Sequence, residues 1–216
     1  MAKNAKWSDD YWLLLMQLYL QKPVGIKPIY SRKMVDLSLE LHLPPQQLYT
    51  RMCQIAKLKT PRIEHIWETY GNNPDKLARA VSLWRSMRGY GNAIEFYDGV
   101  EVAETFERDF RPVDGHSSMT PVMLTLILDL YFRLTPITMV AETPEVKELA
   151  RLIKLSPQEV ADVMEVYQHC DPYLKRKEVV ISPWIQPCSE IWRRYGNGDT
   201  EQLASLAQQL KVYFES

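Results

Sequence analysis

The sequence predicts a mainly α-helical protein made of two tandem helix-turn-helix-like bundles. Three observations support this prediction: the chain repeats itself, apolar residues recur at helical spacing within each copy, and proline and capping residues mark the expected helix starts. With 216 residues, 46% of them hydrophobic, the chain has enough apolar side chains for packed cores and is not expected to be disordered.

An internal repeat runs through the chain, and its two copies align at a shift of 112 residues. After thirteen extra residues in the second copy the alignment resumes. A constant offset of this kind indicates a duplicated structural unit. We therefore predict a first repeat at 1–90, an acidic linker at 91–118 and a second repeat at 119–216. The matching segments are Leu18-Tyr19-Leu20 with Leu130-Tyr131-Phe132, Pro45-Gln46 with Pro157-Gln158, and Ile66-Trp67-Glu68-Thr69-Tyr70-Gly71-Asn72 with Ile191-Trp192-Arg193-Arg194-Tyr195-Gly196-Asn197.

The boundaries of the expected helices are marked by their chemistry. Thr143 and Ser156 each precede a proline, which places an N-cap hydroxyl before a proline at the first helical position. Ser156 with Glu159 also fits a capping box, and Ser31 is the expected cap of the matching helix in the first repeat. A Tyr-Gly-Asn tripeptide recurs after amphipathic runs and is expected to end helices through a left-handed glycine. The helices predicted in the first repeat are 8–21, 32–41, 45–57, 61–70 and 74–88, with equivalents in the second.

Three features lie outside the repeated helices. Asp98-Gly99, flanked by β-prone residues within 94–106, predicts a short β-hairpin in the linker. Residues 177–181, inside the insertion of the second repeat, predict a brief strand. Trp184 stands between two prolines in the same insertion and is a candidate anchor for a partner.

Charge is divided unevenly along the chain, although the net charge is only −1. The first repeat has 14 Lys and Arg against 7 Asp and Glu, a balance of +7. The linker has a balance of −5 and the second repeat one of −3. A basic first repeat favours an anionic partner such as DNA, which the average over the chain conceals.

The composition also bears on the cell compartment. Three cysteines, Cys53, Cys170 and Cys188, are too few and too scattered for a disulfide framework, which predicts free thiols in a reducing cytosol. No stretch approaches the roughly 20 apolar residues that cross a bilayer, and the N-terminal segment has no apolar signal region. We expect a soluble cytoplasmic protein with no membrane partner.

The first repeat contains the outline of a helix-turn-helix unit. The expected helices 32–41 and 45–57 are separated by about three residues and preceded by a third helix. With Leu48, Met52 and Ile55 in the core, a rotation of 100° per residue turns a polar face outward. Glutamine can pair with adenine, and Thr, Arg and Lys suit bases or phosphates. The predicted DNA-binding residues are Lys27, Arg32, Lys33, Gln46, Gln47, Thr50, Arg51, Gln54, Lys57 and Lys59.

The equivalent face of the second repeat has a different chemistry. It is expected to expose Gln158, Asp162, Glu165 and His169. Because carboxylates repel phosphate, this repeat is not expected to enter a DNA groove. Its predicted role is packing, dimerisation or binding a protein partner.

Several segments of the second repeat together form a recognisable pattern. They are Leu128-Asp129-Leu130-Tyr131-Phe132-Arg133-Leu134, the segment Glu145–Leu155, Ser156-Pro157 with Val160, Asp171-Pro172, and Glu190-Ile191-Trp192. With these residues the second repeat resembles the helical, non-catalytic N-terminal region that precedes the nuclease domain in some HNH-type restriction endonuclease-like proteins. The resemblance covers most of the second repeat, and the first repeat shows it more faintly. It implies a DNA-associated accessory region without its catalytic domain, since the chain lacks the paired histidines of that nuclease.

Neither of two other patterns predicts an active site. Asp129 with Glu145-Val146-Lys147 has the residue types of a metal-nuclease core, but an acid at an expected helix start complements the helix dipole. His169-Cys170 with Cys188 is too sparse for tetrahedral zinc. No catalytic residue, metal site or cofactor is predicted.

The sequence therefore predicts a non-enzymatic DNA-binding or DNA-associated protein, with the first repeat as the contact. The alternative is a helical scaffold that binds protein and no nucleic acid. In that case the acidic second repeat would meet a basic partner or the first repeat of another chain, giving a homo-oligomer. An enzyme of unrecognised type would require a pocket lined by convergent polar groups.

Overall fold

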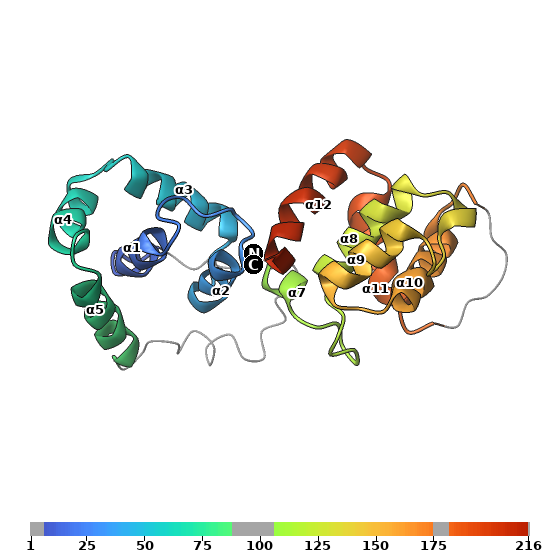
Figure 1. Cartoon of the computed structure of the whole chain (residues 1–216), viewed down its shortest axis with the longest axis horizontal. Helices are drawn as coiled ribbons and strands as arrows, with labels where there is room; N and C mark the ends of the chain where they lie inside the picture. The colour runs from blue at the N-terminus through green and yellow to red at the C-terminus, as the bar shows by residue number, and fades with distance from the viewer. Residues whose placement is uncertain (1–6, 88–105, 175–181, 216) are drawn as a thin grey trace. The chain divides into compact units, whose positions relative to one another are not determined.

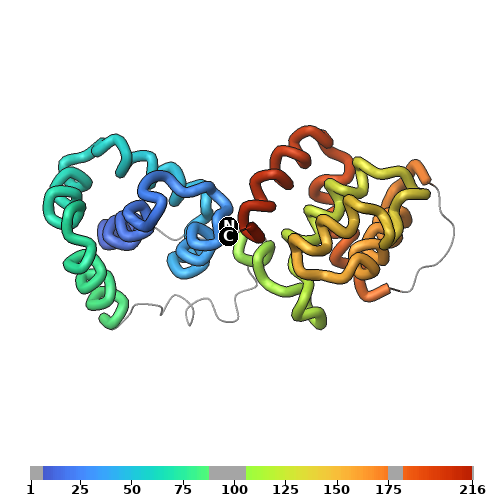
Figure 2. The backbone as a smooth tube through the Cα atoms, in the orientation of Figure 1, coloured from blue at the N-terminus to red at the C-terminus, as the bar shows by residue number. Residues whose placement is uncertain are grey.

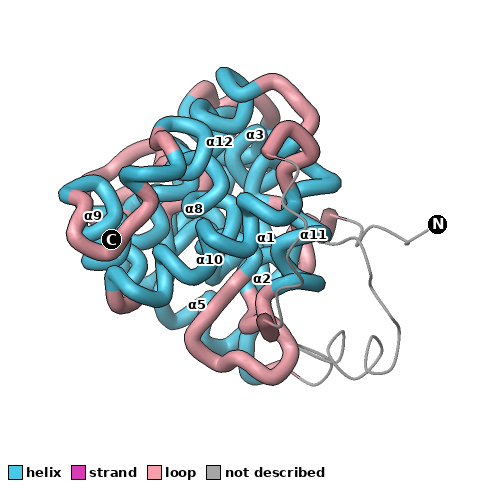
Figure 3. The backbone as a smooth tube through the Cα atoms, turned by 90° about the vertical axis from the view of Figure 1, so that its right-hand side faces the viewer, coloured by secondary structure: helices cyan, strands magenta, loops and turns pink. Residues whose placement is uncertain are grey.

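The computed structural model describes residues 7–87, 106–174 and 182–215, which form helices joined by loops (Figure 3). The prediction of a mainly α-helical fold is confirmed. The chain divides into two compact units, unit 1 (1–103) and unit 2 (104–216), so the division falls within the predicted linker. The predicted hairpin at 94–106 lies outside the described residues except for Phe106, which begins a helix, and the predicted strand at 177–181 lies outside them entirely.

Unit 1 consists of helices packed around the first one (Figure 1). The central helix contacts the third, fourth and fifth helices, and the second packs against the third. The helices within residues 7–87 follow the predicted spans closely, because proline or polar punctuation separates each apolar run from the next. They are α1 (Tyr11–Leu20), α2 (Arg32–Leu41), α3 (Pro45–Ala56), α4 (Pro61–Tyr70) and α5 (Pro74–Ser86).

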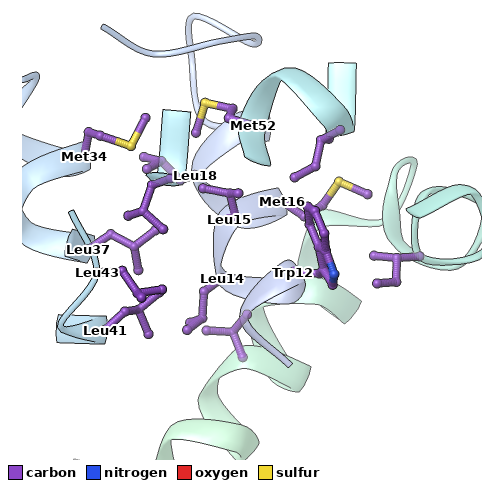
Figure 4. Packing of buried hydrophobic residues seen from close by; sticks show 14 of the residues in the cluster. Trp12, Leu14, Leu15, Met16, Leu18, Met34, Leu37, Leu41, Leu43 and Met52 are labelled. Carbon is purple, nitrogen blue, oxygen red and sulfur yellow. The ribbon is translucent and has the colours of Figure 1, made fainter. Parts of the chain in front are cut away.

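The core of unit 1 is a cluster of apolar side chains on both sides of α1 (Figure 4). Leu14, Leu15 and Met16 of α1 are fully buried, and Met34 of α2 and Met52 of α3 belong to the same buried cluster. Burying a side chain of this size contributes about 1.5–3 kcal/mol. The buried faces of α2 and α3 fix which of their side chains remain on the surface.

A tight turn of three residues joins α2 to α3. His42 ends α2 in the left-handed conformation with φ of 54°, and its backbone N–H donates to Ser38 O. The Leu43 N–H also donates to Ser38 O, at 3.1 Å, and the Leu43 side chain is fully buried. Pro45 then starts α3. This turn fixes the angle between the two helices.

Unit 2 is a bundle of helices (Figure 2), arranged around α8. Nine of the thirteen residues of α8 are buried. Neighbouring helices pack on several sides of α8. Lys154 ends α9 with φ of 60°, and Leu155 N–H donates to Ala150 O at 2.9 Å, so the turn before α10 has the form of the α2–α3 turn. The elements are α7 (Phe106–Phe110), α8 (Pro121–Arg133), the 3₁₀ turn η1 (Pro136–Thr138), α9 (Pro144–Ile153), α10 (Pro157–Cys170), α11 (Ile185–Ile191), the π-helical turn η2 (Trp192–Gly196) and α12 (Thr200–Glu215).

Residues 106–110, which belong to the predicted linker, form α7 within unit 2 and pack on its other helices. Asp109 accepts two hydrogen bonds from the Arg194 guanidinium, at 2.7 and 2.8 Å. The Phe110 ring lies edge-on to Tyr213 with centroids 5.2 Å apart. The bidentate ion pair and the ring contact attach α7 to the rest of unit 2.

A side-chain capping hydrogen bond is present at one of the three predicted N-cap positions. Ser156 Oγ accepts from Glu159 N–H at 3.2 Å, which confirms the capping box. Ser31 and Thr143 occupy the N-cap positions predicted for them, but neither side chain accepts a hydrogen bond from its helix. Thr143 Oγ1 instead donates to Thr138 O at 2.6 Å, which ties the preceding loop. Caps that the sequence analysis missed occur at Thr60, Asn73 and Thr120, each before a proline.

The Ser156–Glu159 capping box predicts a pH-dependent contribution to stability. Ser156 N–H and Oγ–H donate to Glu159 Oε2 at 2.8 and 2.7 Å, which lowers the pKa of Glu159. A lowered folded-state pKa stabilises the fold above the unfolded pKa, and this contribution is lost as pH falls through the folded-state pKa. Glu159→Gln is expected to lower the free energy of unfolding by about 0.5 kcal/mol at neutral pH, and by nothing in strong acid.

Urea unfolding at neutral pH and in acid would measure this difference. Glu148→Gln, an exposed change on α9, is the matched control and should be neutral in both conditions. A Glu159→Gln effect of equal size at the two pH values would contradict the assignment.

The recurring Tyr-Gly-Asn tripeptide has a different cause from the predicted one. Gly71 has φ of −57°, so it is not left-handed, and Gly196 lies within the π-helical turn. A Cβ on Gly71 would lie 2.6 Å from Trp67 O, and one on Gly196 would lie 2.5 Å from the Trp192 ring. At both positions, atoms of the tryptophan four residues earlier occupy the space that a side chain on the glycine would need. The third tripeptide, at 90–92, lies outside the described residues.

Candidate nucleic-acid interface

Helix α3 exposes the polar face that its apolar spacing predicts. Gln46, Thr50 and Lys57 are exposed, while Gln47 and Gln54 are half-buried. The opposite face of the helix is fully packed into the core of unit 1. The exposed face holds hydrogen-bonding and cationic groups and no carboxylate, since α3 contains neither Asp nor Glu.

Basic residues flank α3 without nearby acids in the sequence. The segments 22–35 and 41–63 contain eight Lys and Arg and no Asp or Glu. Asp36, one turn into α2, is the first exposed carboxylate after the first segment, and Glu40 pairs with Arg85 at 2.7 Å. Segments rich in cations and without acids of their own favour a positive local potential. Their exposed cations are Lys22, Arg32, Lys33, Lys57, Lys59 and Arg62.

The Lys27 side chain is not placed where it could contact a phosphate. Its residue is only 8% exposed, and its Nζ donates to Gln21 O at 2.6 Å and to Pro23 O. Burial, followed by the charge of Lys33, lowers the pKa of Lys27 below its ordinary value. Its backbone N–H points to Met52 Sδ at 3.2 Å. Lys27 therefore holds the loop before α2, a role that its position in the sequence did not indicate.

Arg51 is occupied by contacts within unit 1. Its guanidinium lies 5.0 Å from the ring centroid of Trp7 and 5.6 Å from that of Trp12. Its Nη1 also donates to Gln54 Oε1 at 3.3 Å. The two predicted DNA-binding residues Arg51 and Gln54 thus contact each other, and Arg51 covers the aromatic pair before and within α1. Helical spacing placed Arg51 at the edge of the face but could not show that Trp7 lies beside it.

These contacts predict that Arg51 contributes to stability. Arg51→Ala is expected to lower the free energy of unfolding of unit 1 by about 1–2 kcal/mol, through the loss of two partly desolvated cation–π contacts. Denaturant unfolding followed by tryptophan fluorescence would measure the change. Lys57→Ala, on the exposed end of the same helix, should leave stability unchanged. Equal stability of both variants would show that the ring contacts contribute nothing.

Gln46 and Thr50 lie one turn apart on the exposed face of α3. Gln46 Nε2 donates to the Tyr30 hydroxyl, and Thr50 Oγ1 donates to Gln46 O at 2.9 Å. Gln46 is thereby oriented by a side chain from the segment before α2. Of the predicted DNA-binding residues, six are exposed and Lys27 is buried; the exposed ones are Arg32, Lys33, Gln46, Thr50, Lys57 and Lys59.

The equivalent helix of unit 2 is acidic on its surface. Asp162 and Glu165 of α10 are exposed, and Gln158 Nε2 donates to Asp162 Oδ1 at 2.7 Å.

Trp184, the candidate anchor, lies against the His116 ring with centroids 4.0 Å apart, so its ring already has a partner within unit 2.

Two further observations concern the described residues alone. Among residues 7–87, 106–174 and 182–215, no group of three His, Cys, Asp or Glu side chains could hold a metal ion. Within the same ranges, no helix combines the length and apolar character needed to cross a membrane.

Helix α3 and the segments beside it thus expose cationic and hydrogen-bonding side chains, among them Gln46 and Thr50. Known proteins add nothing to this assignment, because no protein family model, curated protein or solved structure matches the chain. The likeness to the N-terminal region of HNH-type endonuclease-like proteins therefore stays a prediction.

Proposed function

We propose that the chain is a non-enzymatic DNA-binding protein built from two copies of one helical unit. The element bounds support the duplication: α2 and α9 each have ten residues and begin 112 positions apart, and α3 and α10 begin at the same offset. The two turns also share a left-handed residue at the same place, His42 and Lys154. Both similarities extend the sequence repeat to the backbone.

Unit 1 is the proposed DNA contact. Its α2, turn and α3 have the order and spacing of a helix-turn-helix unit, in which the second helix lies in the major groove. The observation on which the proposal rests is the exposed face of α3, which combines Gln46 and Thr50 with flanking cations and has no carboxylate. Gln46 and Thr50 are suited to base edges, and Lys33, Lys57 and Lys59 to phosphates.

Unit 2 is the proposed packing or partner unit. The face of α10 that corresponds to the DNA contact exposes Asp162 and Glu165. Bringing two carboxylates toward the phosphate backbone would oppose binding. Duplication followed by a change of surface charge accounts for one DNA-binding copy and one that binds something else.

The salt dependence of binding to a fluorescent mixed-sequence duplex tests this proposal. If four or five phosphates are contacted, a plot of the logarithm of the association constant against the logarithm of the salt concentration should have a slope of about −4. Fluorescence anisotropy of the full chain over a salt series would measure the slope. A chain that fails to bind at micromolar concentration and low salt is not a DNA-binding protein of this kind.

A protein-binding scaffold is the second candidate function. It is favoured by the contact between Arg51 and Gln54, which removes two residues from the DNA-binding face, and by the acidic surface of α10. A scaffold without DNA affinity would show no anisotropy change with duplex at any salt concentration. The two functions are therefore separated by the same titration.

A further inference from the structure

Unit 2 contains a cavity of about 320 Å³ between α10 and the segment that includes η1. Its floor includes Met139 and Gln168, which is only 5% exposed and whose Nε2 approaches Met139 Sδ at 3.4 Å. Its wall includes the carboxylates of Glu142, Asp162 and Glu165. We call this site the acidic groove. Among the described residues no cation forms an ion pair with these three carboxylates.

Apolar side chains lie beside these acids. Val140, which lines the groove, is 43% exposed, and Ile137 in the adjoining 3₁₀ turn is 88% exposed. A polar cavity next to exposed apolar groups is typical of a surface that binds another protein segment. The occupant that fits has a cation beside one or two apolar side chains.

Unit 1 presents a segment of this chemistry, the loop Lys22–Ile26. Lys22 is exposed, and Val24 and Ile26 are 61% and 44% exposed although they are apolar. The loop is held in place from beneath, because the buried Lys27 Nζ donates to carbonyls on both sides of Lys22 and Gly25 N–H donates to Tyr19 O at 2.9 Å. A loop that is ordered before binding loses little conformational entropy when it docks.

We propose that the acidic groove of one copy of the chain binds the loop Lys22–Ile26 of a second copy. Lys22 meets the carboxylates of Asp162 and Glu165, while Val24 and Ile26 cover the exposed apolar groups beside the groove. The contact is heterologous, so each bound pair retains one unused loop and one unused groove. Assembly therefore proceeds head to tail, and it requires no DNA.

Sedimentation velocity of the full chain without DNA tests the proposal. The average mass should rise with protein concentration at an ionic strength of about 0.01 M. It should fall toward that of the monomer at about 0.15 M, as the Debye length shortens from about 30 Å to about 8 Å. A chain that stays monomeric at low ionic strength up to submillimolar concentration overturns the proposal.

Two variants that block opposite ends identify the surfaces. Lys22→Ser with Val24→Ser removes the loop contact, and Asp162→Lys with Glu165→Lys reverses the groove. Each variant alone should be monomeric, whereas an equimolar mixture should form a dimer and nothing larger, because only one native loop and one native groove can then meet. Circular dichroism confirms that both variants are folded.

Matched controls carry equivalent changes elsewhere: Arg79→Ser with Leu83→Ser for the loop, and Glu145→Lys with Glu148→Lys for the groove, all at exposed positions. The controls should associate as the parent does. If the groove variant associates normally, the groove is not the site. If the loop variant associates normally, the occupant assigned here is wrong. These measurements exclude DNA, so their failure leaves the proposed DNA-binding function untouched.

Discussion

Removing three exposed lysines from the α2–α3 region is expected to weaken DNA binding on the order of a hundredfold to a thousandfold at about 50 mM salt. The variant is Lys33→Ala with Lys57→Ala and Lys59→Ala. Each phosphate contact that is lost forgoes the release of condensed counterions, which is worth about tenfold in affinity at that salt concentration. All three side chains are exposed, so unit 1 should remain folded. Anisotropy titrations should show the salt slope fall by about 3.

The matched control removes three exposed cations from unit 2, Lys147→Ala with Arg151→Ala and Arg193→Ala. It changes the net charge of the chain by the same amount. A contact made by α2 and α3 predicts a much smaller loss for the control than for the test variant. Equal losses would mean that DNA responds to overall charge, and the assignment to unit 1 would then be wrong.

Gly196→Ala is expected to lower the free energy of unfolding of unit 2 by about 3 kcal/mol. The added Cβ would lie 2.5–2.7 Å from three atoms of the Trp192 ring. That ring has little freedom to move, because its centroid is 5.8 Å from Tyr131, 5.6 Å from Phe132 and 6.2 Å from Tyr167. Relief of the overlap therefore disturbs a whole aromatic cluster.

Gly198→Ala is the control for this substitution. Its Cβ would meet Tyr195 O at 3.4 Å, an ordinary contact, and only Asn197 separates it from the packed glycine. Urea unfolding followed by near-ultraviolet circular dichroism should show a large loss for Gly196→Ala and a small change for Gly198→Ala. Similar stabilities would show that the tryptophan ring can yield at little cost.

The helices were predictable because their signals are local. The spans predicted at 32–41 and 61–70 agree with α2 and α4, since an apolar period of 3.6 residues and a proline or cap define each helix within a few residues of sequence. The prediction began α1 three residues early, at 8 rather than Tyr11, because two aspartates there occupy a turn. Local patterns therefore predicted the elements but not each cap.

The candidate site was predictable only in part, because side-chain environments depend on distant residues. Spacing correctly placed Gln46, Thr50 and Lys57 on the exposed side of α3. It could not show that Lys27 folds beneath its own loop or that Arg51 lies on Trp7, since both contacts join separate segments. The acidic groove also depends on the loop after η1 reaching α10, which no periodicity describes.

The prolines at helix starts have a consequence for recognition. A proline supplies no N–H and disfavours a helical conformation in the residue before it, so the helix behind it cannot grow backwards into the connecting loop. Helices α3, α4, α5, α8, α9 and α10 all begin in this way. The first turn of α3 is therefore already formed before a ligand binds. None of the binding free energy is needed to extend the helix.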